Sequence, residues 1–200
     1  MKRIKYNSPV ILTFTIICVS ILLTDNMLGG NIMTLFTVYP RFDYTNIRSY
    51  FSLFSHALGH ANWEHITGNF TFILLLGPIL EEKYGSKNLM IMMFVTALIT
   101  GILNVLFLST ALLGASGIVF MFIIMSSIVN VRSGEIPITF ILVVALFLGK
   151  EVISATGEAT GLAEATNVSN FGHILGGICG SAFAFLTLHL QGDTFKEENH

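Results

Sequence analysis

Charged residues are scarce in this chain. Aspartate, glutamate, lysine and arginine make up 11% of its 200 residues, against about 25% in an average soluble domain. So few ionic groups cannot cover a water-facing surface, and a soluble globular protein is close to excluded. The ten basic residues form no cluster, and the chain has no Gly-rich phosphate loop. We therefore expect neither nucleic acid nor nucleotides among its partners.

Cysteine is also scarce. The two cysteines, Cys18 and Cys179, both lie inside apolar runs, where a free thiol behaves as a small hydrophobic group. The sequence therefore contains no disulfide framework and no C-x-x-C metal motif.

Hydrophobic residues, by contrast, make up 53% of the chain and form long runs. Residues 88–131 are 44 consecutive uncharged residues, which is about two membrane crossings at roughly 20 residues each. Small and polar residues near 108–117 divide this run. We predict an all-α polytopic membrane protein, a single domain over residues 1–200 with six transmembrane helices. The helices are expected at about 8–24, 62–82, 87–109, 115–131, 136–154 and 170–190.

The basic residues predict the orientation. The first apolar run is longer than the h-region of a signal peptide, about 7–15 residues, so we expect a retained helix. With the N-terminus inside, seven of the ten basic residues lie on the inner side, in agreement with the positive-inside rule. We therefore expect both termini in the cytoplasm, below a plasma or inner membrane. The inner residues are Lys2, Arg3, Lys5, Lys83, Lys87, Arg132 and Lys196, and the outer ones are Arg41, Arg48 and Lys150.

The two long outer connections differ in composition. Residues 25–61 contain seven aromatic residues, and aromatic rings prefer the level of the lipid headgroups, so part of this loop should lie in the outer face of the membrane. Residues 154–169 are acidic and contain glycine, and we expect a more mobile loop there.

Six polar residues lie where polar groups cost free energy, at the outer ends of predicted helices. They are His56, His60, His65, Asn69, Ser116 and His173. His65 and Asn69 are four residues apart and so share a helix face. Such residues can simply join neighbouring helices through hydrogen bonds worth about 1 kcal/mol. Intramembrane ionisable groups usually mark a functional cavity, however, and four at one rim favour that interpretation.

Ser116 and His173 form the candidate catalytic pair. Ser116 lies within the small residues 114–117 at a helix start, where backbone N–H groups could receive an oxyanion. His173 shares a helix face with Gly176, and small residues on that face would draw another helix close. Either cluster alone could be ordinary helix packing, but a serine and a histidine within hydrogen-bond reach suffice for acyl transfer. Glu64 is the nearest carboxylate and is poorly placed, so a dyad is expected rather than a triad.

Four motifs follow one another in residues 56–180. They are His56-x3-His60-x4-His65-x3-Asn69, Gly77-x3-Glu81-x3-Gly85, Gly114-Ala115-Ser116-Gly117 and His173-x2-Gly176-x3-Gly180. Each motif is unspecific alone. In this order on six predicted spans they resemble the rhomboid family of intramembrane serine proteases.

The resemblance implies a six-helix core with a Ser116–His173 dyad in a water-filled cavity that opens to the outer face. It implies an oxyanion hole formed by His65, Asn69 and the backbone N–H of Ser116. It implies no cofactor and no metal. The partners it implies are transmembrane protein substrates within the lipid bilayer.

The resemblance also implies supporting roles. His60, with His56 beside it, would order the long first loop. Glu81 would be structural at the inner end of the second helix. Gly114, Gly117 and Gly176 would keep the surroundings of the dyad clear.

Two positions depart from the usual family pattern. The family often carries Trp-Arg shortly before the first histidine, whereas this chain has Phe51-Ser52. It often carries a tyrosine four residues after the serine, whereas this chain has Phe120, which can stack beside an imidazole but offers no hydroxyl. Neither change removes a group that performs the chemistry. We therefore predict an active serine endopeptidase that cleaves transmembrane segments of other membrane proteins near the outer face.

Two other functions are open. A catalytically inactive rhomboid-like protein would only bind or escort membrane helices, and the presence of both Ser116 and His173 argues against it. A metal or haem protein would use His56, His60 and His65. Their spacing of four and then five residues rotates the third ligand away on a helix, and no cysteine or carboxylate completes a usual ligand shell.

Overall fold

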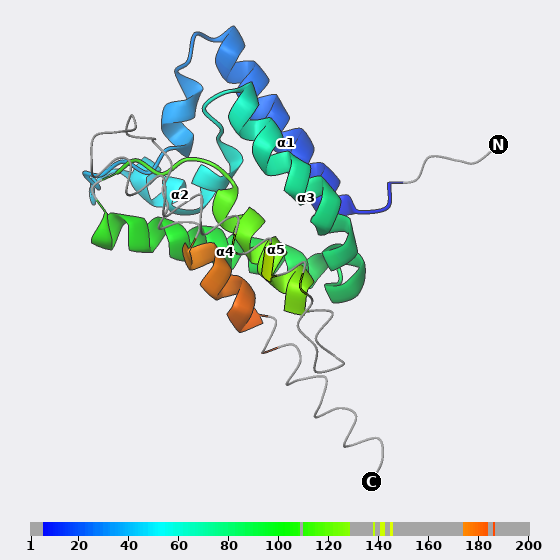
Figure 1. Ribbon diagram of the computed structural model, residues 1–200. Helices are drawn as coiled ribbons and strands as arrows, with labels where there is room; N and C mark the ends of the chain where they lie inside the picture. Colours follow the sequence, from blue (N-terminus) through cyan, green and yellow to red (C-terminus); the bar gives the residue numbers. More distant parts are fainter. Residues whose placement is uncertain are drawn as a thin grey trace, which may run out of the picture.

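The computed structural model describes residues 6–108, 110–128 and 174–183, together with positions 138, 141, 142, 145 and 186. These residues are helical apart from connections and one antiparallel bridge between Val38 and Leu112, so the predicted all-α class is confirmed. The longer helices are α1 (Pro9–Met27), α3 (Trp63–Tyr84), α4 (Ser86–Phe107), α5 (Ser116–Ile128) and a helix at Ile174–Phe183 (Figure 1).

The ends of these helices follow local signals. Pro9 is the first residue of α1, a position where its fixed φ and missing N–H cost nothing. The side chain of Asn62 accepts a hydrogen bond from the N–H of His65 at 2.8 Å and caps α3. Gly85, at φ +79°, ends α3 and leads directly into α4. The predicted helix at 136–154 and the loop at 154–169 fall almost entirely outside the described residues.

α1 and α4 are long and apolar enough to cross a membrane. α3 is as long as α4, at 22 residues, but Glu64, His65 and Asn69 make its first two turns polar. Large apolar side chains on all three helices are exposed, which is the kind of surface expected to face lipid rather than water. Examples are Ile16, Leu23, Leu75, Ile79, Met90, Phe94 and Leu106.

α1 and α3 lie side by side and run in opposite directions (Figure 1). The two helices are close at Gly77, where a Cβ atom would lie 2.6 Å from the Cδ1 of Ile11. Ile11 is fully buried and fills this space, so a larger residue at position 77 would have to displace its side chain. This contact places the start of α1 beside the last two turns of α3.

The connection between α1 and α3 contains structure that the sequence analysis did not predict. It folds into two short 3-10 helices, η1 (Ile32–Phe36) and η2 (His56–Leu58), and into α2 (Ile47–Ser55). α2 packs against α4 so closely that a methyl group at Gly101 would collide with the backbone carbonyl of Leu53. The aromatic-rich connection is therefore a packed layer that contacts α4 and not a free loop.

The helix at Ile174–Phe183 packs against α5 through glycine. A methyl group at Gly176 would collide with the backbone of Gly117, and one at Gly180 would lie 2.7 Å from the carbonyl oxygen of Met121. Two backbones can approach this closely only where side chains are absent. The small-residue stripe of the last predicted helix therefore faces the first turns of α5.

Candidate active site

Gly114 marks the point where α3 meets the start of α5. Its φ is +118°, and a Cβ atom there would lie 2.6 Å from Nε2 of His65 and 3.6 Å from Nδ2 of Asn69. His65 is half-buried and Asn69 is buried. The structure therefore brings together three residues of the predicted site that lie up to 49 positions apart in the chain.

Ser116 is the first residue of α5. The first N–H groups of a helix have no acceptors within the helix, so the backbone around Ser116 offers donors at this end. Ser116 itself is half-buried, whereas Ala115 beside it is fully buried. The nucleophile candidate is thus accessible, and its immediate neighbour is held in the core.

The segment before Ser116 is held by the connection between α1 and α3. Val38 and Leu112 exchange two backbone hydrogen bonds of 3.0 and 2.9 Å, and the N–H of Gly114 donates to the carbonyl of His56 at 2.9 Å. The position of residues 112–114 therefore depends on that connection.

His60 is fully buried, and neither of its ring nitrogens has a hydrogen-bond partner among the described residues. Its ring stands edge-on to that of His65 at 5.2 Å between centroids and lies 5.7 Å from the ring of Phe70. Burial, and then the neighbouring His65, lower the pKa of His60 to about 3. His60 is therefore a neutral ring at physiological pH, packed directly behind His65.

His56 joins the connection to α4. Its Nε2–H donates to the carbonyl of Ala97 at 3.0 Å, and Nε2 lies 3.4 Å from Oγ1 of Thr100. Burial lowers the pKa of His56 to about 4, so this ring is also neutral. Because the carbonyl of His56 receives the N–H of Gly114, this residue links α4 to the backbone beside Ser116.

The polar face of α4 that meets His56 was not predicted from the sequence. Thr96, Thr100 and Asn104 are all buried. Asn104 donates from Nδ2 to the carbonyl of Thr110 at 3.0 Å, and its Oδ1 has no partner within the described part of the chain. The available signal was the spacing of four residues, which places all three on one face of an otherwise apolar helix.

Glu81 lies at the opposite end of α3. Its carboxylate accepts hydrogen bonds from the backbone N–H groups of Val10 at 3.0 Å and Ile11 at 3.1 Å, and from the hydroxyl of Ser86 at 2.7 Å. A helix N-terminus favours negative charge, so Glu81 fastens the start of α1 to the turn between α3 and α4.

Phe120, the aromatic residue four positions after Ser116, lies buried in α5. His173 lies outside the described residues, and the structure begins again at Ile174. The packing of Gly176 on Gly117 nevertheless brings the start of that last helix to the residue that follows Ser116.

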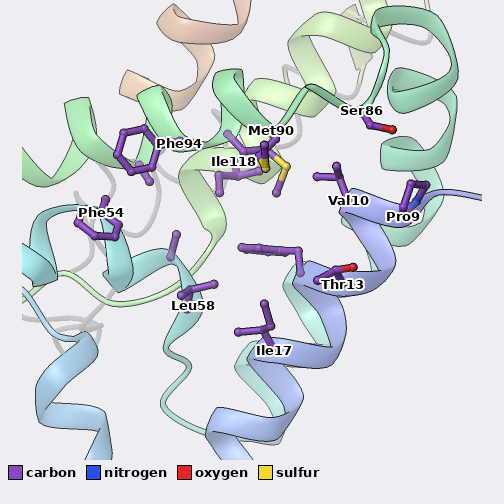
Figure 2. A pocket seen from close by; sticks show the side chains of 14 residues that line it. Pro9, Val10, Thr13, Ile17, Phe54, Leu58, Ser86, Met90, Phe94 and Ile118 are labelled. Atoms are coloured by element: carbon purple, nitrogen blue, oxygen red, sulfur yellow. The ribbon is translucent and has the colours of Figure 1, made fainter. Parts of the chain in front are cut away.

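A cavity of about 440 Å³ lies apart from these residues, between α1, η2 and α4. Figure 2 shows Val10, Ile17, Leu58, Met90 and Phe94 around it, and its lining is almost wholly apolar. None of the predicted site residues lines it. In the part of the chain that the structure describes, no three histidine, cysteine or acidic side chains are placed to hold a metal ion.

Comparison with known proteins identifies the family. Residues 48–190 match the family model of the Rhomboid domain. The chain is also similar to the rhomboid-like protein 11, chloroplastic, of Arabidopsis thaliana, with 24% identity over 152 residues, which covers 72% of this chain and 54% of the relative. The chain thus spans about half the length of this curated relative. Rhomboid family members are membrane proteins, and the family includes serine proteases. Because the match extends over most of its length, the chain belongs to the rhomboid family.

Proposed function

We propose that this protein is an intramembrane serine endopeptidase that cleaves transmembrane segments of other membrane proteins near the outer face. The observation that carries the proposal is the convergence of three segments at Gly114–Gly117. A Cβ atom added to Gly114 would contact the side chains of His65 and Asn69. One added to Gly176 would collide with the backbone of Gly117. Ser116 lies between these two contacts.

The nucleophile is Ser116 and the base is His173. Gly176, which packs on Gly117 of α5, follows His173 by three residues, a spacing that puts two residues of a helix on one face. The imidazole takes the proton of the Ser116 hydroxyl as its oxygen attacks the scissile carbonyl. It then gives the proton to the leaving amine, and water hydrolyses the acyl-enzyme.

The oxyanion hole consists of His65, Asn69 and the backbone N–H of Ser116. The Nδ2 of Asn69 is buried and has no hydrogen-bond partner among the described residues. Donors held in advance toward a developing negative charge supply much of the catalysis in such sites. An amide donor that makes no structural bond fits that role.

The remaining predicted residues have supporting roles in this scheme. His60 packs behind His65, His56 holds the backbone of Gly114, and Glu81 is structural. Phe120 provides an apolar wall within α5. The chemistry requires no metal and no cofactor.

The whole chain is proposed to form one domain with six crossings and both termini in the cytoplasm. The type of membrane is part of the proposal, since the name of the Arabidopsis relative places that protein in a chloroplast. Single cysteines at Lys87 and Gly161, in a chain whose native cysteines are changed to alanine, test the topology. Position 161 should react with an impermeant maleimide from outside and position 87 only after permeabilisation. The reverse labelling would contradict the proposed orientation.

The substrate must unwind locally, because a peptide bond inside a helix is hydrogen-bonded and shielded from the nucleophile. Transmembrane segments weakened by glycine, proline or polar residues should therefore be preferred. Replacing a glycine or proline near the cleavage site with leucine, which favours the helix by about 1–3 kcal/mol, should slow cleavage while binding persists. Unchanged cleavage rates across such a series would argue against unwinding.

The decisive experiment labels the purified protein with a fluorophosphonate probe, which reacts with activated serines. The wild type should be labelled and should cleave a transmembrane substrate, and Ser116→Ala should do neither. The control is thermal unfolding, in which Ser116→Ala should match the wild type. A folded wild-type protein that is not labelled and cleaves nothing would favour the alternative, a catalytically inactive rhomboid-like protein that binds or escorts membrane helices.

A further inference from the structure

A second, polar cavity lies within the connection between α1 and α3, away from Ser116. Its volume is about 310 Å³, and its walls come from η1, the segment at 37–46 and the first turns of α2. Two of its lining residues are arginines, Arg41 and Arg48, and Ser49, Ser52 and Thr37 add hydroxyl groups. None of these residues belongs to the proposed catalytic apparatus.

Neither arginine has a counter-ion among the residues that the structure describes. Within the described part of the chain, no ion pair or side-chain hydrogen bond engages the guanidinium of Arg41 or Arg48. Asp43 also lines the cavity, but its Oδ1 accepts the N–H and the hydroxyl of Thr45 at 2.9 and 2.7 Å. These bonds lower the pKa of Asp43, so the carboxylate stays ionised. The lining therefore carries two positive charges and one negative charge, a net attraction for an anion.

Arg48 stands at an electrostatically unfavourable position for the helix itself. It lies in the first turn of α2, and that turn contains no acidic residue. The N-terminus of a helix carries partial positive charge, which favours anions and disfavours cations. An anion in the cavity would offset this repulsion.

The residues around the cavity indicate where such an anion comes from. Tyr39 lines the cavity and is 49% exposed. Tyr44 and Tyr50, exposed by 70% and 44%, pack their rings against Phe42, another lining residue. Ile47, between them in the chain, is 79% exposed. Exposed tyrosine rings and an exposed aliphatic side chain in one segment are typical of a segment that lies at the headgroup level of a bilayer. The anion nearest to such a segment is a lipid phosphate.

We infer that this cavity binds the phosphate of an anionic phospholipid, with Arg41 and Arg48 as its ligands. A guanidinium presents several N–H donors in a plane and is well suited to phosphate oxygens. In the topology proposed above, this lipid lies in the outer leaflet of the membrane. Its binding does not depend on protease activity.

Lipid binding here should reach the region of Ser116 through the backbone. Val38 lies between cavity residues Thr37 and Tyr39, is fully buried, and exchanges two hydrogen bonds with Leu112. Leu112 is two residues before Gly114. A headgroup that orders the cavity wall therefore also orders the strand-like contact next to the proposed active site.

The test measures lipid binding to the purified protein in a maltoside detergent, by native mass spectrometry. Dioctanoyl-phosphatidylglycerol should bind, and dioctanoylglycerol, which lacks the phosphate, should not. Arg41→Gln and Arg48→Gln should each weaken binding about fivefold and the double variant about 25-fold. Asp43→Asn should strengthen it about twofold to fivefold, and Lys87→Gln, a matched neutralisation at the opposite end of the bundle, should change it less than about twofold.

Three outcomes would overturn the inference. Binding of phosphatidylglycerol that is unchanged in the folded Arg41→Gln/Arg48→Gln double variant would remove the site. Equal binding of dioctanoylglycerol would make the contact one of acyl chains alone. Displacement of the lipid by an equal concentration of inorganic phosphate would assign the cavity to free phosphate instead. All three measurements are independent of cleavage, so they stand apart from any failure of the proposed protease function.

Discussion

The two ends of α3 differ in whether the buried polar atoms there have hydrogen-bond partners. At the end near α4, Glu81 has three hydrogen-bond donors for its two carboxylate oxygens. At the end near α5, Asn69 and His60 bury nitrogen atoms that no described residue engages. A buried polar group without a partner costs about 1–3 kcal/mol. The protein therefore stabilises itself at one end of the helix and gives up stability at the other, which is the end where a substrate would need donors.

His56 shows that not every buried polar atom at the α5 end of α3 lacks a hydrogen-bond partner. It lies at the costly end, yet its Nε2–H and its carbonyl both make hydrogen bonds, and only Nδ1 has no partner in the described part of the chain. Structural bonds there tie the connection between α1 and α3 to α4 and to Gly114. We therefore expect variants of α3 to separate into those that change stability and those that change activity.

The largest effect should come from the proposed dyad. Ser116→Ala and His173→Ala should each lower kcat by about 10⁴–10⁶-fold, as loss of one member does in soluble serine proteases. The double variant should be barely worse than either single one, because both residues serve one covalent route. Single-turnover cleavage of a transmembrane substrate measures this. Wild-type rates in either folded single variant would remove the dyad from the mechanism.

Paired variants at the two ends of α3 should show the sharpest contrast. Asn69→Ala should lower kcat by about 10²–10³-fold, since it removes one donor of the proposed oxyanion hole. It should leave the melting temperature nearly unchanged, because Nδ2 makes no hydrogen bond with any described residue. Glu81→Ala should lower the free energy of unfolding by about 2–4 kcal/mol through its unsatisfied donors. Where it remains folded, it should retain most of its activity per folded molecule.

Kinetics and thermal unfolding on the same samples check this pair. The comparison fails if Asn69→Ala destabilises as much as Glu81→Ala, or if Glu81→Ala loses activity in the folded fraction to the extent that Asn69→Ala does.

Two glycines with positive φ provide a matched steric comparison. Alanine at Gly85 or Gly114 should cost about 1–3 kcal/mol from the backbone conformation alone. At Gly85 the added methyl meets nothing within 4 Å, whereas at Gly114 it would lie 2.6 Å from Nε2 of His65. Displacing His65 should lower kcat by a further factor of about 10². Similar unfolding midpoints with very different kcat values are the expected result, and equal kcat values would separate His65 from catalysis.

The smallest effect concerns pH. In the unfolded chain a histidine has a pKa near 6.5, whereas in the fold the pKa values of His56 and His60 are about 4 and about 3. Below pH 6.5 the unfolded state therefore binds more protons than the folded state, and stability falls as the pH falls, by up to about 1.4 kcal/mol per pH unit for each histidine. His60→Phe should reduce this slope in unfolding experiments between pH 7 and 5. An unchanged slope would show that His60 does not carry it.

Local patterns predicted a large part of this structure. Four predicted helices correspond to α1, α3, α4 and α5 within a few residues, because apolar run length and helix-capping residues are local signals. α2 was missed because a nine-residue helix inside an aromatic-rich connection leaves no long apolar run. The polar face of α4 was missed because Thr96, Thr100 and Asn104 look like isolated polar residues until a partner helix is present.

The sequence by itself determined which side chains are chemically able to form the proposed site and which of them share a helix face. The spacing of His65 and Asn69, the helix start at Ser116 and the glycines at 176 and 180 are all properties of short segments. Only the tertiary structure decided that His65 and Asn69 reach Gly114, that Gly176 meets Gly117, and that Glu81 fastens the start of α1 some 70 residues away in the chain. The reason is physical: helical periodicity is set by neighbouring residues, whereas a contact between two helices depends on which side chains are small enough to let the backbones approach.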